Sequence, residues 1–224
     1  MTAPVALLRG SCGTPYAPPS NRWATPADPS ERALVAHVVP PVLDIGCGPG
    51  RHVVALAEQG VPVLGIDVCD PALDLARRRG APVLHRSVFD PVPGSGRWGS
   101  ALLLDGNIGI GAAPVDLLGR VAELVRPGGR LIVELDPPGS SSEIRRVRLE
   151  IESTGSGGTH PSGLRVEAGP WFDWCALPVD RIGDTAAEAG LSLTDMRNED
   201  DRILAVLTTP GQAPDPAIPD VVPR

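Results

Sequence analysis

Residues 42–51 read Val-Leu-Asp-Ile-Gly-Cys-Gly-Pro-Gly-Arg, a short apolar run that leads into an acidic, glycine-rich turn. Gly46, Gly48 and Gly50 can adopt backbone conformations that are closed to other residues, so a ligand can approach this turn closely. Asp44 adds a negative charge beside the turn. That charge would repel a pyrophosphate group but favours a ligand with an ammonium or sulfonium group. The stretch predicts a buried strand followed by a binding site for a cationic ligand.

The sequence on both sides of this turn alternates between strand and helix patterns. Strands are predicted at Val42–Ile45, Val61–Asp67, Pro82–Ser87, Ala101–Asp105 and Leu131–Leu135, and helices at His52–Gln59, Pro71–Arg79 and Val115–Val125. This alternation is typical of an α/β fold with a doubly wound, mostly parallel sheet. Ligands of such sheets bind at the carboxyl ends of the strands. The glycine turn, Asp67, Ser87 and Asp105 all fall at those ends.

Three segments are expected along the chain. Residues 1–40 form an N-terminal segment, irregular over residues 1–20 with a short helix over Arg32–Val39, and a candidate lid. Residues 41–208 form the main domain and contain an antiparallel insertion over 137–180, because apolar and charged residues alternate around Val147–Ile151. A helix at Asp180–Ala189 and an antiparallel pair, Leu191–Arg197 and Ile203–Thr208, close this domain. Residues 209–224 are rich in proline and are expected to be disordered.

Composition excludes several function classes. The net charge of −7 argues against nucleic acid as a partner, because phosphate backbones need a basic surface. The sequence contains no lysine, so a pyridoxal Schiff base or a P-loop lysine is impossible. The four cysteines lack metal-ligand spacing, and no metal is expected. No leader or membrane span is recognised, so a soluble, cytoplasmic protein is expected.

Three stretches together resemble a known family. They are Leu43–Gly50, Gly65-Ile66-Asp67-Val68 and Leu124-Val125-Arg126-Pro127-Gly128-Gly129-Arg130-Leu131. In this order and spacing the chain resembles a class I S-adenosylmethionine-dependent methyltransferase of the small-molecule type, over residues 40–136 and in outline over 180–208. The resemblance implies a Rossmann-like fold with a seven-stranded sheet, S-adenosylmethionine as the cofactor, and a small methyl acceptor with an oxygen, nitrogen or carbon nucleophile.

The resemblance also implies cofactor contacts. Asp44 would favour the cationic end of the cofactor, Asp67 would accept hydrogen bonds from the ribose hydroxyls, and Val68 would flank the adenine. Ser87 departs from the family pattern, which has an aspartate there, so Ser87 or Asp90 would contact the adenine. The full set of expected cofactor-binding residues is Asp44, Gly46, Cys47, Gly48, Gly50, Asp67, Val68, Ser87, Val88, Phe89, Asp105, Gly106 and Asn107.

The acceptor site is expected in the segments that are least like the family. Trp23, Trp171, Phe172 and Trp174 would contact the acceptor by stacking, or else pack in the core. A general base is needed only if the acceptor must lose a proton. Four histidines are available, at positions 37, 52, 85 and 160. His160 is the candidate base because it lies in the insertion, while the other three are interpreted as structural.

Two other functions stay open at this point. One is a relative that binds S-adenosylmethionine without methyl transfer, in a regulatory or cyclase-like role. The other is a nicotinamide-dependent dehydrogenase. Arg51 stands at the sixth position of a Gly-x-Gly-x-x-Gly frame that starts at Gly46, which disfavours a dinucleotide.

Overall fold

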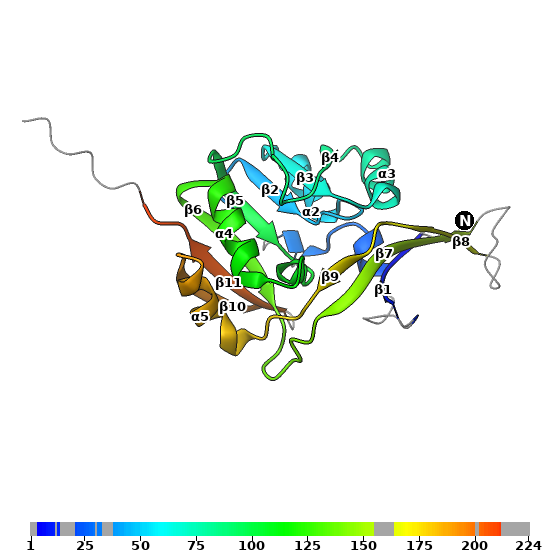
Figure 1. Cartoon of the computed structure of the whole chain (residues 1–224). Coiled ribbons are helices and arrows are strands. Elements are labelled where there is room, and N and C mark those ends of the chain that lie inside the picture. Colours follow the sequence, from blue (N-terminus) through cyan, green and yellow to red (C-terminus); the bar gives the residue numbers. More distant parts are fainter. Residues whose placement is uncertain are drawn as a thin grey trace, which may run out of the picture.

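The computed structural model describes residues 4–11, 13, 21–29, 31–32, 38–154, 164–199 and 202–211. Its main sheet has seven strands in the order β10-β11-β6-β5-β2-β3-β4 (Figure 1). Five strands run parallel: β2 (Val42–Ile45), β3 (Val63–Asp67), β4 (Val83–His85), β5 (Trp98–Leu103) and β6 (Val125–Leu135). Strand β11 (Arg202–Thr208) pairs antiparallel with β6, and β10 (Ser192–Glu199) pairs antiparallel with β11. The predicted doubly wound, mostly parallel fold is confirmed.

Helices cover both faces of this sheet because alternate residues of each strand point to opposite sides. On one face Val42 and Leu102 pack with Leu56 of helix α2 (Arg51–Glu58). On the other face Leu43 packs in the cluster that contains Leu117 of α4 (Pro114–Leu124) and the buried side of α5 (Ile182–Glu188). Helix α3 (Asp70–Arg78) connects β3 to β4. The central strands are therefore apolar on both sides, as a sheet covered by two layers requires.

The described part of the chain contains the short 3-10 helices η1 (Asn21–Ala24), η2 (Asn107–Gly109) and η3 (Val179–Arg181). The ends of the helices carry residues that are typical of helix ends. Helix α3 has Pro71 and an acidic residue in its first turn and two arginines in its last, which suits the helix dipole. Asp28 and Glu31 exchange hydrogen bonds between side chain and backbone, at 2.9 and 3.0 Å, as a capping box. Of the predicted helix Arg32–Val39, residues 33–37 lie outside the described part.

A second, antiparallel sheet is built around the long strand β7 (Arg145–Thr154), which pairs with β1 (Val5–Gly10), β8 (Leu164–Ala168) and β9 (Phe172–Trp174). The prediction of an antiparallel insertion after Leu135 is confirmed. The prediction that residues 1–20 are irregular is wrong for Val5–Gly10. The apolar run at Val5–Leu8 is short and has proline- and glycine-rich neighbours, and its partner strand lies far along the chain.

The second sheet docks on the main domain through small side chains. Ala6 of β1 and Ile151 of β7 pack with Ala72 of α3, Cys69 and Ala24 of η1. Figure 1 shows β7 and its partners running beside the seven-stranded sheet, and β7 contacts α3. This contact places the second sheet next to the carboxyl ends of the parallel strands.

The end of the described chain is more ordered than expected. Thr209, where the disordered tail is predicted to begin, is buried, and its hydroxyl donates a hydrogen bond to the Arg126 carbonyl at 2.9 Å. Residues 212–224 lie outside the described part. Among the described residues, none of the helices is long and apolar enough to cross a bilayer.

Candidate functional site

A cavity of about 310 Å³ lies between the two sheets. We call its two walls the floor and the roof. The floor consists of the lining residues between Asp44 and Gly111, which follow the carboxyl ends of β2, β3, β4 and β5. The roof consists of lining residues from β1, β7 and the segment around β9, and these are Leu8, Leu149, Pro170, Trp171, Phe172 and Trp174. Trp23 of η1 also lines the cavity.

The glycine turn is fastened from the end of β5. Asn107 Nδ2 donates hydrogen bonds to the carbonyl oxygens of Ile45 and Gly46, both at 2.9 Å. Gly46 has a φ of 71°, and a Cβ atom there would lie 2.7 Å from Asn107 Nδ2. Only glycine therefore allows the Asn107 amide to reach the turn. Gly50 serves packing instead, because its Cβ would lie 2.9 Å from the Ala76 Cβ of α3.

Asp67 joins two loops below the cavity. Its Oδ2 accepts a hydrogen bond from the Gly48 amide and its Oδ1 from the Cys69 amide, both at 2.8 Å. Burial raises the pKa of the Asp67 carboxyl, and the backbone amides offset part of that rise. Each carboxylate oxygen keeps further acceptor capacity for a ligand hydroxyl.

Asp44 carries a buried, unsatisfied acceptor in the floor. Its side chain is 2% exposed, and its Oδ2 has no hydrogen-bond partner among the described residues. Burial, and next the negative charge of Asp105, raise the pKa of Asp44 to about 7, while Arg51 opposes the rise. A buried carboxyl without a partner costs stability, and a cationic ligand in the cavity would supply that partner.

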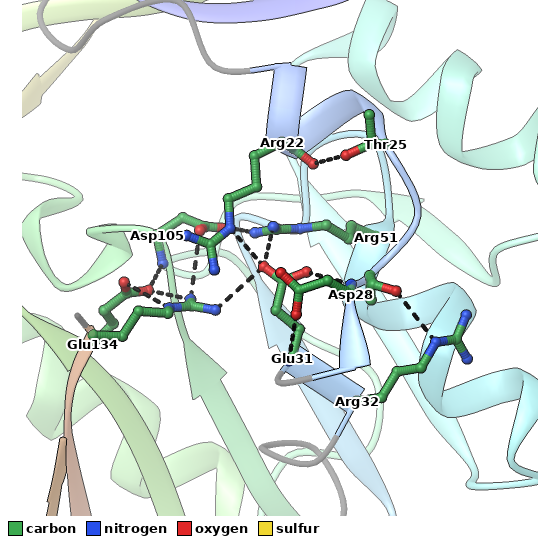
Figure 2. A network of polar contacts seen from close by, with 10 residues as sticks. Arg22, Thr25, Asp28, Glu31, Arg32, Arg51, Asp105 and Glu134 are labelled. Atoms are coloured by element: carbon green, nitrogen blue, oxygen red, sulfur yellow. Dashed lines mark hydrogen bonds and ion pairs between the residues drawn. The ribbon is translucent and has the colours of Figure 1, made fainter. Parts of the chain in front are cut away.

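Beneath the floor lies a network of buried ion pairs, drawn in Figure 2. Arg51 donates to Glu31 and, at 2.5 Å, to Asp105. Arg202 of β11 pairs with Glu134 of β6 and, at 3.3 Å, with Glu31. Glu31, Arg51 and Arg202 are at most 5% exposed. The network ties the N-terminal segment, which carries Glu31, to strands β6 and β11 of the main sheet.

Asp105, like Arg51, is a member of this network that also lines the cavity. Its φ is 55°, a conformation that non-glycine residues rarely adopt, and the Asp105 amide donates to Glu134 at 2.6 Å. Burial alone would raise the pKa of Asp105. The nearby His52, Arg51 and Arg202 outweigh that effect and hold the pKa of Asp105 below its ordinary value. Asp105 therefore faces the cavity as a carboxylate.

His52, interpreted from the sequence as structural, lines the cavity beside Asp105. It is 4% exposed, and its Nε2 has no hydrogen-bond partner among the described residues. Burial lowers the pKa of His52 to about 4, against the opposing pull of Asp105. The imidazole is therefore neutral near pH 7. Its position one residue after Arg51 at the start of α2 was the available signal, since the first turn of this helix faces the cavity.

The roof presents aromatic rings. Trp171 is 36% exposed, and the Arg148 guanidinium lies 4.6 Å from its ring centroid. Trp174 is 5% exposed, and its Nε1 donates to the Gly106 carbonyl at 3.0 Å. A Cβ on Gly109 would lie 2.7 Å from the Trp174 ring. Trp174 thus docks the second sheet onto the turn after β5, in addition to lining the cavity.

Most of the residues expected from the sequence meet in this cavity. Of the expected cofactor-binding residues, those that line it are Asp44, Gly46, Cys47, Gly48, Asp67, Val68, Ser87, Val88, Phe89, Asp105 and Asn107, whereas Gly50 and Gly106 do not. All four expected acceptor residues line it, namely Trp23, Trp171, Phe172 and Trp174. His85 is exposed and does not line it. His37 and His160 lie outside the described residues.

Comparison with known proteins gives a family match for part of the main domain. Residues 42–129, which include the glycine turn, Asp67 and Asp105, match a family model described as a methyltransferase domain. Curated protein sequences gave no significant match.

Solved structures share the fold over most of the chain. A SAM-dependent methyltransferase from Bacteroides fragilis, in complex with S-adenosyl-L-homocysteine, is 21% identical, with a TM-score of 0.67 over 93% of this chain and 89% of that one. The sugar N-methyltransferase KedS8 from Streptoalloteichus is 20% identical, with a TM-score of 0.58 over 85% and 90%. A 1,6-didemethyltoxoflavin-N1-methyltransferase from Burkholderia thailandensis is 21% identical, with a TM-score of 0.54 over 81% and 77%.

The matched domain contains the glycine turn and the acidic strand ends, and the likeness of fold extends to the seven-stranded sheet around them. Residues 42–129 thus match a methyltransferase domain, and the chain has the fold of the S-adenosylmethionine-dependent methyltransferases with which it is compared.

Proposed function

We propose that the protein transfers the methyl group of S-adenosylmethionine to a small-molecule acceptor, with the cofactor bound on the floor of the cavity. The observation that carries this proposal is Asp44, a buried carboxyl whose Oδ2 lacks a partner beside a glycine turn. S-adenosylmethionine has a sulfonium and an ammonium group, and either would balance this carboxylate. A dinucleotide would instead bring a diphosphate against it.

The other floor residues fit the remaining parts of the cofactor. A Cβ atom on Gly48 would meet only Leu149, at 4.0 Å, so the backbone of Gly48 is open to close approach. Asp67, held by two amides at 2.8 Å, has acceptor capacity left for the ribose hydroxyls. Val68 and Val88 offer apolar surface for the adenine, and Ser87 offers a hydroxyl. The proposed cofactor site thus uses groups of matching chemistry along one wall.

The chemistry asks little of the protein beyond alignment. The bound cofactor supplies an activated methyl group on a positively charged sulfur. The chain's own task is to hold the acceptor nucleophile in line and to exclude water, which the roof residues do by covering the cavity. Where an acceptor must lose a proton, His52 is the cavity-lining histidine among the described residues, and it is neutral near pH 7. His160 stays a prediction.

A small acceptor is supported by the size of the cavity and by the neighbours. The cavity volume of about 310 Å³ is near the lower end of the usual range for ligand sites. Two of the neighbours are named for a sugar and for didemethyltoxoflavin.

We further propose that the protein works in the cytoplasm, where its cysteines at 47, 69 and 175, all free thiols, would stay reduced.

Calorimetric titration of the purified protein tests the proposal. S-adenosylmethionine and S-adenosylhomocysteine are expected to bind in the micromolar range, while NAD gives no heat of binding. Asp44→Asn is the matched variant, because the amide keeps the shape of the carboxyl but removes its charge. Asp44→Asn should lower the affinity for S-adenosylmethionine, and the NAD and buffer titrations serve as controls. Tighter binding of NAD than of either sulfur nucleoside would overturn the proposal.

A further inference from the structure

The two walls of the cavity differ in chemistry. Every charged side chain that lines the cavity in the described part of the chain belongs to the floor, and these are Asp44, Arg51, Asp67, Arg86 and Asp105. The roof residues carry no charged group, and their only side-chain donors are the indole N–H groups of Trp171 and Trp174. The Trp174 N–H already bonds to the Gly106 carbonyl. A ligand against the roof therefore meets apolar and aromatic surface.

Two aromatic rings at this cavity remain exposed to solvent. Phe89 of the floor is 49% exposed and Trp171 of the roof is 36% exposed. The Phe89 ring lies over Gly111, where a Cβ atom would be 3.1 Å from Phe89 Cζ. Large exposed apolar side chains that gather at a cavity mark a binding site more often than isolated ones do. Here one ring comes from each wall.

The Trp171 ring is held in place by charges behind it. The Arg148 guanidinium lies 4.6 Å from the ring centroid, and Glu150 accepts two hydrogen bonds from Arg148, at 2.8 and 2.6 Å. Glu150 is 2% exposed and also accepts a hydrogen bond from Arg9 of β1 at 2.5 Å. Because Arg148 occupies one face of the indole, a ligand can stack only on the other. The cation also polarises the ring, which favours an electron-rich partner.

We propose that the methyl acceptor is a small, uncharged aromatic molecule that stacks on Trp171 with Phe89 at its edge. This inference rests on the proposed function, since it assigns the floor, apart from Phe89, to the cofactor and the roof to the acceptor. A pyranose ring would bury several hydroxyls against the roof, and each buried hydroxyl without a partner costs binding free energy. A charged acceptor would meet no counter-ion on the roof.

The test uses three probes of known structure on protein saturated with S-adenosylhomocysteine. They are 2-naphthol, its saturated counterpart trans-2-decalol, and D-glucosamine. Binding is measured by calorimetry and by saturation-transfer NMR. We expect 2-naphthol to bind about three- to tenfold more tightly than 2-decalol, because stacking adds to the apolar contact that both share. D-Glucosamine should bind more weakly than either.

Variants locate the site. Trp171→Ala should lower the affinity for 2-naphthol about tenfold. Trp171→Phe should keep most of that affinity, because a ring can still stack. Leu193→Ala is the control, since Leu193 is a similarly exposed apolar residue, 39% exposed, on β10 and outside the cavity. It should leave probe binding unchanged. Affinity for S-adenosylhomocysteine should be the same in all three variants.

Each result decides the proposal. If S-adenosylhomocysteine binds but 2-naphthol does not, or if D-glucosamine binds more tightly, the aromatic acceptor is refuted while the proposed function stands. An unchanged affinity in Trp171→Ala also refutes it. If S-adenosylhomocysteine itself fails to bind, the proposed function falls, and the acceptor assignment falls with it.

Discussion

The floor and the roof of the cavity are held together by different forces. The floor rests on buried charges: Arg51 and Arg202 are paired with three acidic side chains, and Asp44 and His52 are buried without partners for one atom each. The roof rests mainly on apolar packing and on rings that stay partly exposed, with a single buried carboxylate behind it, Glu150, which pairs with Arg9 and Arg148. Buried charges fix one geometry because any displacement leaves them unpaired, whereas apolar contacts tolerate change. The comparison indicates that the floor suits a single, fixed ligand and that the roof suits selection among different ligands.

The largest expected effect is on the network beneath the floor. Glu31→Ala should lower the free energy of unfolding by about 3–5 kcal/mol, because it leaves Arg51 and Arg202 buried with a missing partner. Urea unfolding measures this change. The control is Glu58→Ala, which breaks the exposed pair with Arg32 and should cost about 1 kcal/mol or less. Equal losses in both variants would show that the network adds no stability of its own.

Asp44 should make stability fall as pH rises. Its folded pKa of about 7 lies above the ordinary value, so the folded state binds more protons than the unfolded state. The stabilising contribution is complete below about pH 4 and is lost as pH rises to about 7. Asp44→Asn should therefore gain stability over the native protein across this window, by at most about 4 kcal/mol.

Urea unfolding of both proteins at several pH values checks this prediction. Saturating S-adenosylmethionine should flatten the difference, because the cation balances the carboxylate. A difference that stays constant from pH 4 to pH 8 would show that Asp44 is not the titrating group.

Asp67 should matter for the cofactor more than for the acceptor. Asp67→Ala should reduce the binding free energy of S-adenosylmethionine by about 1–3 kcal/mol, because the ribose hydroxyls lose their acceptor. Calorimetry measures the loss, with Asp70→Ala as the control, since the Asp70 side chain is 71% exposed three residues further on. An Asp67→Ala variant that binds the cofactor normally would refute the ribose role.

The smallest expected effect concerns His52. Since burial lowers its pKa to about 4, its NMR signals should not shift as pH is varied around 6.5. Comparison with His52→Gln assigns the signals. A titration of the His52 signals near pH 6.5 would mean that this edge of the floor is open to water.

The floor could be predicted from the sequence and the roof only in part. The glycine turn, Asp44 and Asp67 belong to continuous strand–turn–helix units, so their position follows from local patterns. The aromatic run at Trp171–Trp174 was visible, but its role in docking on Gly106 depends on contacts 68 residues apart. Arg202 and Glu31 meet across 171 residues, and no local pattern reports such a pairing. Strand β1 was missed for the same reason.

One consequence concerns the order of assembly. Arg9 and Glu150, which join β1 to β7, are 141 residues apart, so the roof forms by closing a long loop. Such closure carries a large entropic cost and slows folding. During synthesis, the β2–β4 region emerges from the ribosome well before β7 exists. We therefore expect nascent chains to acquire the floor first, and the acceptor wall to be the last part completed and the first to open.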